Sequence, residues 1–265
     1  MDVSEIQCKT ALSSSSLPGL SYSLNPYRGC QHRCAYCYAP NVLRIPRDVW
    51  DIKIQLKTNI SKILSKELRK KKPGIVGIST VTDPYQPLEQ RYRLTRSCLE
   101  QLLQYDFPAH IQTKSSLVTR DIDVISRFSD PQVMMSIGTL RDHERMLLEP
   151  YSSPIQERLD ALRKISDAGV RTAIFFGPVY PTITTDDVPH ILDCFKESGA
   201  SEIWVDQLNL KPGIWETIQK ALQHDKELIR IFSEQIGKHN DYYSIIREEI
   251  QKKATERHLK IIDAF

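Results

Sequence analysis

Apolar and polar residues follow two different periods along this chain, and the period switches repeatedly. Short apolar or alternating runs, which are typical of strands, are followed by stretches with apolar residues three and four positions apart, the spacing of helices. The expected strands are 51–57, 74–80, 109–114, 132–138, 170–176 and 201–206. The expected helices are 59–72, 89–105, 121–128, 155–168 and 186–198, with Asn59, Thr119 and Ser153 as N-caps of the first, third and fourth.

This alternation predicts an α/β fold built on a parallel sheet. Strand and helix alternate about six times, which is too few for a closed eight-fold barrel. We therefore expect a partial (β/α)6 TIM-type barrel over residues 21–210, preceded by an N-terminal extension (1–20) and followed by a C-terminal helical extension (211–265). Functional residues in such sheets follow the carboxyl ends of the strands. The polar, Gly and Pro residues at these ends are Thr80, Thr82, Asp83, Lys114, Ser136, Gly177, Pro178, Gln207 and Asn209.

Composition narrows the class of protein. The chain has 265 residues, of which 40% are hydrophobic and 26% charged, as in a folded globular protein. The net charge of +3 excludes a globally basic, histone-like protein. Because no apolar run reaches about 18 residues and the N-terminus lacks an apolar core, we expect neither a membrane span nor a signal peptide, and a cytoplasmic location.

The charge is distributed unevenly. Residues 44–72 contain ten Lys or Arg and three Asp or Glu, a local charge of +7, so the rest of the chain carries −4. One interpretation is a solvated helix face whose basic end suits the helix dipole, and this is favoured for residues 70–72. The other is a surface that binds a polyanion such as nucleic acid, and both remain open for Arg44 and Arg47.

Three of the six cysteines lie within eight residues. Cys30, Cys34 and Cys37 are spaced C-x3-C-x2-C, a pattern that favours a metal or cluster site. Structural zinc needs four ligands, commonly as two pairs, and the chain has no second pair. An iron–sulfur cluster normally takes four cysteines, so three would leave one iron open for chemistry. A cluster is therefore favoured over zinc, while Cys98 and Cys194 fall on predicted helix faces and are expected to be structural.

The cysteine motif near the start of a six-fold β/α pattern resembles the radical S-adenosylmethionine (SAM) enzymes, and further segments resemble the spore photoproduct lyase-like branch. The resemblance covers roughly residues 20–210. The matching segments are NPYRGCQHRCAYCYAP (25–40), STVTDPYQPLE (79–89), TKSSLVTRD (113–121), MSIGT (135–139), LEPYSSPIQERLDAL (148–162) and FFGPVYP (175–181).

This resemblance implies a function. In the family, three cysteines hold a [4Fe-4S] cluster whose open iron binds SAM. One electron, from a donor such as a flavodoxin or ferredoxin, then cleaves SAM to a 5′-deoxyadenosyl radical that abstracts hydrogen from the substrate. The implied ligands are the three cysteines already named, and the implied cofactor-binding residues are Tyr36, Thr82, Asp83, Lys114 and Ser136.

One position departs from the lyase. Thr80 stands where the lyase has the cysteine that returns hydrogen to the product radical, and a threonine O–H bond is too strong to replace it. Tyr36, Tyr38 and Tyr85 are therefore the candidate hydrogen donors. The sequence predicts a radical SAM enzyme with an unassigned substrate, with DNA-lesion repair as a sub-hypothesis. The alternative is a non-catalytic iron–sulfur or zinc protein that binds partners or transfers electrons.

Overall fold

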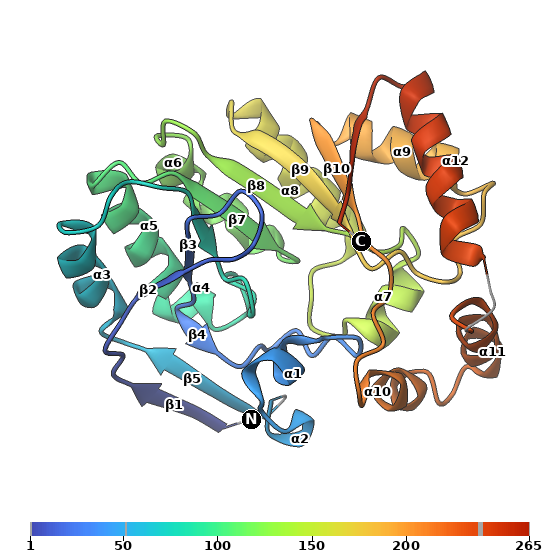
Figure 1. Cartoon of the computed structure of the whole chain (residues 1–265), viewed down its shortest axis with the longest axis horizontal. Helices are drawn as coiled ribbons and strands as arrows, with labels where there is room; N and C mark the ends of the chain where they lie inside the picture. Colours follow the sequence, from blue (N-terminus) through green and yellow to red (C-terminus); the bar gives the residue numbers. More distant parts are fainter. Residues whose placement is uncertain (1, 51, 238–240, 265) are drawn as a thin grey trace.

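The computed structural model describes residues 2–50, 52–237 and 241–264. Its main element is an eight-stranded sheet in the order β11-β10-β9-β8-β7-β6-β3-β2 (Figure 1). The strands of this sheet are β2 (Leu12–Ser14), β3 (Tyr22–Leu24), β6 (Val76–Ile78), β7 (Ala109–Thr113), β8 (Gln132–Ser136), β9 (Arg171–Phe176), β10 (Glu202–Val205) and β11 (Lys260–Asp263). Every neighbouring pair from β3 through β11 is parallel. The partial barrel of parallel strands is therefore confirmed.

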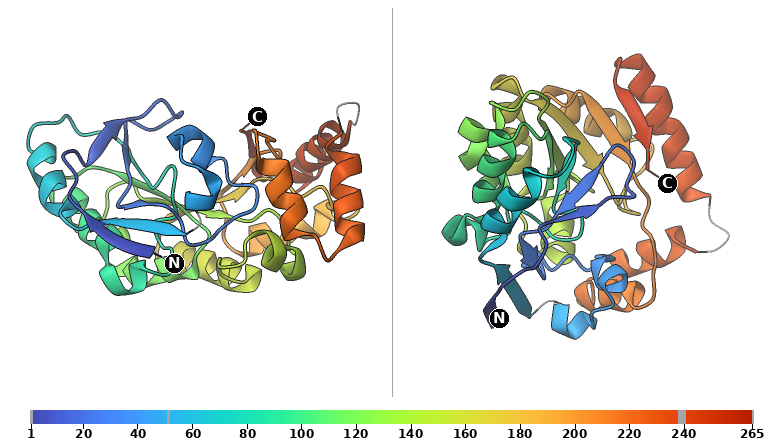
Figure 2. Two further views of the ribbon diagram at one scale, coloured as in Figure 1. Left: turned by 90° about the horizontal axis from the view of Figure 1, so that it is seen from below. Right: turned by 60° about the vertical axis from the view of Figure 1, so that its left-hand side comes forward.

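Helices cover one face of this sheet and leave the other open. Figures 1 and 2 show α5, α8 and α9 packed on the same side of the strands. The helices are α1 (Ala39–Leu43), α2 (Arg47–Trp50), α3 (Ile60–Leu68), α4 (Glu89–Tyr92), α5 (Leu94–Gln104), the 3-10 helix η1 (Ser116–Asp121), α6 (Ile122–Ile125), α7 (Asp142–Leu148), α8 (Ile155–Asp167), α9 (Val188–Glu197), α10 (Ile214–Ala221), α11 (Lys226–Gln235) and α12 (Tyr242–Glu256).

The two faces of the sheet differ as the two-residue period of a strand requires. On the helix side, strand residues such as Met135, Ile174 and Val205 are at most 2% exposed. On the other side, Phe175 and Trp204 are only half-buried. This second face is the concave interior of the partial barrel.

One expected barrel strand lies elsewhere. β5 (Lys53–Lys57) joins β1 (Asp2–Ile6) and β4 (Tyr27–Arg28) in a separate three-stranded sheet, so the prediction that 51–57 begins the barrel is wrong. Its apolar residues Ile54 and Leu56 pack on Tyr27 in a small core of their own. β3 supplies the first barrel strand instead, and Asp51 lies outside the described residues.

Both ends of the chain contribute strands. Residues 1–20 contain β1 and also β2, which pairs antiparallel with β3, so they are part of the two sheets. The C-terminal extension contains α10, α11 and α12, as expected for a helical segment, but it ends in β11, which pairs with β10. The extension is therefore not purely helical.

Several expected helix boundaries also differ. The helix expected over 89–105 divides into α4 and α5 at Arg93, which has a φ of 49°, and the Glu89 carboxylate accepts from the N–H of Thr95 at 3.0 Å. Ser115, not Thr119, caps the segment after β7. Pro154 replaces Ser153 at the start of α8.

The Asn59 side chain makes no cap but binds the backbone of Cys8. Cys8 is therefore tied to the start of α3. No helix in the described ranges is long and apolar enough to cross a membrane.

Candidate functional site

The cysteine loop runs from β4 to α1 and is held by backbone contacts with the β6–α4 connection. Gly29, with a φ of +89°, passes so close to β5 that a Cβ would collide with the Lys53 carbonyl oxygen. The Gln31 backbone N–H donates to the Gln86 side chain at 3.0 Å, and the Gln31 side chain accepts from the Leu88 N–H at 2.6 Å. At the other end, Arg47 donates to the Cys37 carbonyl oxygen at 2.9 Å. Arg47 is therefore a structural residue of this loop.

Asp83 connects the cysteine loop to two barrel strands. It is 7% exposed and accepts from the Thr113 hydroxyl at 2.7 Å and from the backbone N–H of Lys114 at 2.8 Å. The imidazole of His32 lies 3.3 Å from its other side, and the Tyr85 N–H donates to it at 2.8 Å. Burial alone would raise the pKa of Asp83, but His32 and these hydrogen bonds lower it to about 2. The structure thus gives Asp83 a positioning role.

The three cysteines form no disulfide with another described residue, and their thiols raise one another's pKa. Burial raises the pKa of Cys30 to about 12, with further contributions from Asp83 and Cys37. Burial also raises the pKa of Cys34, with Glu149 as the next cause, while Lys114 lowers it. Among the described residues, no three His, Cys, Asp or Glu side chains stand ready-made as a metal site. The three cysteines still fit an iron–sulfur cluster, because thiolates from one loop are the usual ligands of such clusters. A nearby metal cation would also favour the ionised thiolate form, which burial alone disfavours.

Beneath the cysteine loop lies a buried ion pair that the sequence analysis did not identify as functional. Arg158, 0% exposed, donates to Glu149 at 2.5 Å and to the carbonyl oxygen of Ser136 at 2.8 Å. Burial opposes ionisation of Glu149, but Arg158 and then Lys114 lower its pKa to about 2. The hydroxyl of Tyr36 donates to Glu149, and that of Tyr180 lies 3.4 Å away. Both charges fall in a matched segment, LEPYSSPIQERLDAL, but their nine-residue separation matches no local ion-pair spacing.

The expected cofactor-binding residues lie along the carboxyl edge of β6, β7 and β8. The Lys114 ammonium lies 5.7 Å from the centre of the Tyr36 ring. Thr82 is 9% exposed, and its buried hydroxyl has no hydrogen-bond partner among the described residues. The Ser136 hydroxyl accepts from Gln112 at 3.2 Å. Lys114 and Thr82 thus offer polar groups to a ligand, whereas Ser136 is already paired.

The three candidate tyrosines occupy different surroundings. Tyr36 packs edge-on against Tyr180, with ring centroids 5.9 Å apart. Tyr38 is 47% exposed, and Lys211 lies 5.8 Å from its ring centre. Tyr85 is fully buried, with the Arg120 guanidinium 5.9 Å from its ring centre. The structure therefore separates Tyr85 from the other two.

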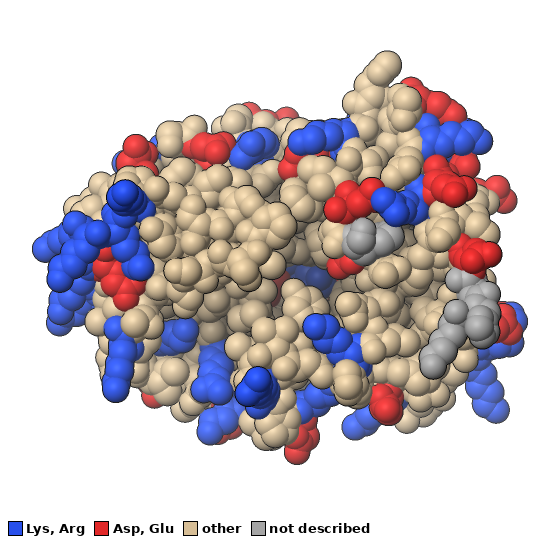
Figure 3. Space-filling model, in the orientation of Figure 1, with Lys and Arg blue, Asp and Glu red and all other residues tan. Residues whose placement is uncertain are grey.

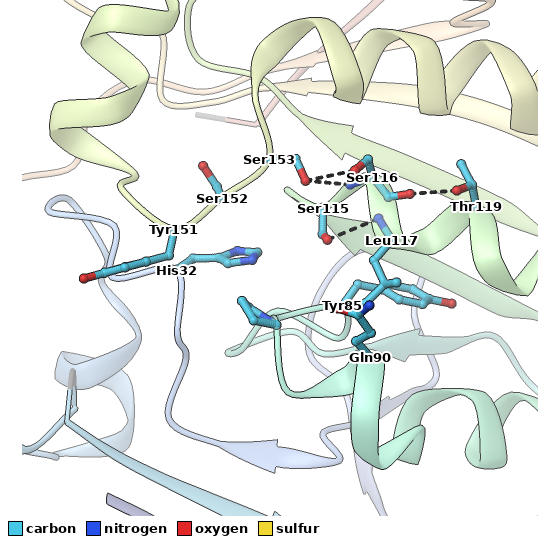
Figure 4. A pocket seen from close by; sticks show the side chains of 11 residues that line it. His32, Tyr85, Gln90, Ser115, Ser116, Leu117, Thr119, Tyr151, Ser152 and Ser153 are labelled. Carbon is cyan, nitrogen blue, oxygen red and sulfur yellow. Dashed lines mark hydrogen bonds between the residues drawn. The ribbon is translucent and has the colours of Figure 1, made fainter. Parts of the chain in front are cut away.

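Tyr85 lines a pocket on the side of the cysteine loop where His32 lies. Figure 4 shows this pocket of about 460 Å³ between the cysteine loop, the β6–α4 connection, η1 and the loop that precedes α8. Hydroxyl groups of Ser115, Ser116 and Ser153 form one wall, and they hydrogen-bond to backbone groups or to one another. The pocket thus adjoins the cysteine loop. The serine hydroxyls of its wall are paired, whereas the buried Tyr85 hydroxyl has no hydrogen-bond partner among the described residues.

The basic segment 44–72 does not form one surface. Lys and Arg side chains gather over α3 at the left edge of the molecule, whereas α1 and α2 lie by the cysteine loop (Figures 1 and 3). The segment is divided in space because β5 carries the chain away between α2 and α3, so its basic residues lie on two separate parts of the surface. The same view shows that the open face is hollowed near its centre (Figure 3).

Comparison with known proteins gives the family. The model named "Radical SAM superfamily" matches residues 24–195. An uncharacterized protein of Methanocaldococcus jannaschii is 30% identical over 195 residues, which is 72% of each chain. A "Radical SAM Nalpha-GlyT isomerase" of Pseudomonas phage M6 is 27% identical over 183 residues, 68% of this chain and 38% of that protein.

Solved structures confirm the fold. A spore photoproduct lyase complexed with dinucleoside spore photoproduct has a TM-score of 0.70 and 15% identity, and the match covers 99% of this chain and 82% of that one. The likeness expected from motif order thus extends to the arrangement of the whole chain. The chain belongs to the radical SAM superfamily, an assignment that makes it an enzyme and implies SAM and an iron–sulfur cluster.

Proposed function

We propose that this enzyme binds a [4Fe-4S] cluster through Cys30, Cys34 and Cys37 and abstracts hydrogen from an organic substrate. The observation that carries the proposal is that the half-buried cysteine loop faces the carboxyl edge of β6 and β7, where Lys114 and Thr82 offer polar groups. When bound, the cluster and SAM supply the 5′-deoxyadenosyl radical. The chain's own residues position these groups and exclude water.

Each edge residue has a role that its contacts support. The Lys114 ammonium pairs with the SAM carboxylate, because charge-assisted hydrogen bonds are the strong ones. The Thr82 hydroxyl, which has no hydrogen-bond partner among the described residues, donates to a polar group of SAM. Ser136 accepts a hydrogen bond from Gln112, so its hydroxyl proton is the group that it can offer to SAM. Asp83 acts indirectly, since both carboxylate oxygens already hold the backbone and side chains around it.

Tyr38 is the best placed of the three candidate hydrogen donors. It follows Cys37 directly and is 47% exposed, so a substrate can reach its hydroxyl. The Tyr36 hydroxyl is hydrogen-bonded to Glu149, and Tyr85, beside the pocket at His32, is fully buried. If the substrate radical takes hydrogen from the protein, Tyr38 supplies it.

A nucleic acid or nucleobase is the substrate class that we favour. The lyase structure with a similar fold is complexed with a dinucleoside, the dinucleoside spore photoproduct. On this chain, Arg44 is exposed on the side of the cysteine loop. The basic surface of α3 lies farther away and would contact only an extended polyanion. A flavodoxin or ferredoxin class protein supplies the electron.

The test is anaerobic reconstitution with iron and sulfide. We expect a dithionite-reducible cluster whose electron paramagnetic resonance spectrum changes when SAM is added, and 5′-deoxyadenosine after reduction. Replacing Cys34 with Ala should abolish both, whereas Cys194→Ala on α9 is the matched control and should retain both. Bound zinc, or a reducible cluster without 5′-deoxyadenosine, would favour the non-catalytic alternative instead.

A further inference from the structure

Asp206 is a carboxylate at the carboxyl end of the last barrel strand, β10, and it has no ion-pair partner in the described part of the chain. Its backbone is fixed, because its N–H donates to the Phe176 carbonyl at 3.1 Å and its carbonyl accepts from Val179 at 2.8 Å. Burial raises the pKa of the Asp206 carboxyl to about 6, and among the described residues only the backbone N–H of Gln207 opposes this rise. A partly buried carboxylate without a partner is costly unless a ligand supplies a donor.

The side chain of Asp206 lies on the open face of the sheet. Trp204 pairs in register with Phe175, and Asp206 follows two residues later on the same side of the strand. The alternate residues Val205 and Phe176 are buried on the helix side, where Phe176 packs on Phe195 of α9.

Gly177 brings the carboxylate and an aromatic ring together. A Cβ on Gly177 would collide with the Phe175 ring and would lie 2.9 Å from the Asp206 Cβ. The absence of a side chain there lets Phe175 and Asp206 stand next to each other. Tyr38 lies beside the segment that follows Asp206, because the Lys211 ammonium lies 5.8 Å from the centre of its ring.

We propose that Asp206 and Phe175 recognise the substrate, the ring of Phe175 stacking on a flat heterocycle while the Asp206 carboxylate accepts a hydrogen bond from its N–H. A nucleobase has this combination of a flat face and N–H groups at its edge, and carboxylates read such groups in other proteins. The position fits substrate recognition, because the segment that follows Asp206 contacts the end of the cysteine loop: the Lys211 ammonium lies 5.8 Å from the centre of the Tyr38 ring, and the Asn41 side chain donates to the Pro212 carbonyl oxygen at 3.0 Å. This inference rests on the proposed function, since it assigns the substrate to the same site.

The experiment measures binding, so that it does not depend on SAM cleavage. Thymidine, cytidine, guanosine and adenosine are titrated calorimetrically into the reconstituted holoenzyme with SAM present. We expect at least one nucleoside to bind and Asp206→Ala to weaken it about tenfold. Phe175→Leu should weaken the same nucleoside, and so should methylation of the ring nitrogen that donates. Asp186→Asn, on an exposed loop before α9, is the control.

Three results would overturn the inference. In the first, no nucleoside binds; in the second, wild type and Asp206→Ala bind the nucleoside equally well. In the third, Asp206→Ala loses as much affinity for SAM as for the nucleoside, which would mean that the carboxylate binds the adenine of SAM. Failure of the proposed function looks different, because it appears as a missing cluster or missing 5′-deoxyadenosine whether or not a nucleoside binds.

Discussion

Two regions at the carboxyl edge of the barrel use carboxylates in opposite ways. Around β6 to α8, Asp83 and Glu149 are buried and every oxygen has a donor, so their pKa values fall to about 2. At the end of β10, Asp206 has no ion-pair partner among the residues that the structure describes, and burial raises its pKa to about 6. The same kind of side chain thus maintains the architecture in one region and is available to a ligand in the other.

The largest expected effect comes from breaking the buried pair in the first region. Arg158→Met leaves the Glu149 charge enclosed without its partner, so the free energy of unfolding should fall by about 3–5 kcal/mol. Urea denaturation measures it. Arg230→Met is the control, because Arg230 pairs with Glu227 and Glu234 on the exposed surface of α11 and should change stability little.

The double variant Glu149→Leu with Arg158→Met removes both charges. It should recover part of the lost stability, because a buried pair is often replaceable by apolar residues. A single Arg158→Met variant as stable as wild type would show that Glu149 is not held as a charge, and the contrast with Asp206 would disappear.

A smaller effect is expected from Asp83→Ala. This change leaves the Thr113 hydroxyl and the N–H groups of Lys114 and Tyr85 without their acceptor, so we expect a loss of about 2–3 kcal/mol. Hydrogen exchange provides a local readout, since the amides of Lys114 and Tyr85 should exchange faster. Asp160→Ala on the exposed side of α8 is the control. Unchanged exchange at both amides would contradict the positioning role of Asp83.

The sequence predicted those parts of the fold and of the site that depend on a local residue pattern. The two-residue and 3.6-residue periods located β6 to β10, five of the seven parallel strands described in the main sheet, but not β3 or β11. The C-x3-C-x2-C spacing identified the cysteine loop. β3, Tyr22–Leu24, was missed because its apolar residues stand among serines, whereas the equally short β6 lies within the apolar run GIVGI. β5 was taken for a barrel strand because its alternation is typical of a strand. Periodicity shows that a segment is a strand but does not specify its partner.

The site was less predictable for a related reason. Lys114, Thr82 and Asp83 could be placed at strand ends, but the donors that occupy Asp83 come from segments up to 51 residues away, as with His32. The Glu149–Arg158 pair, likewise, forms only when the turn before α8 folds back under Tyr36. Asp206 was passed over between Val205 and Gln207 because its distinguishing property, the lack of a partner, exists only in the folded chain.

The smallest expected effect is a difference between the two regions in how the free energy of unfolding depends on pH. A lowered carboxyl pKa gives stability that is present above the unfolded value and is lost as pH falls towards about 2, which applies to Asp83 and Glu149. The raised pKa of Asp206 has the opposite sign, since the folded state favours the protonated acid. Its contribution is present below the ordinary value of 3.8 and is lost as pH rises through about 6.

Asp206→Asn should therefore match wild type in stability near pH 4 and exceed it above pH 6, by at most about 2 kcal/mol because the carboxyl is partly exposed and screened. Glu149→Gln is the counterpart, and it should be least stable relative to wild type near neutral pH. Urea unfolding at intervals from about pH 4 to about pH 7 measures both. If the free energy of unfolding of Asp206→Asn differs from that of wild type by the same amount at every pH in this range, the carboxylate has a partner in solution. That result would contradict the proposal that Asp206 is available to a substrate.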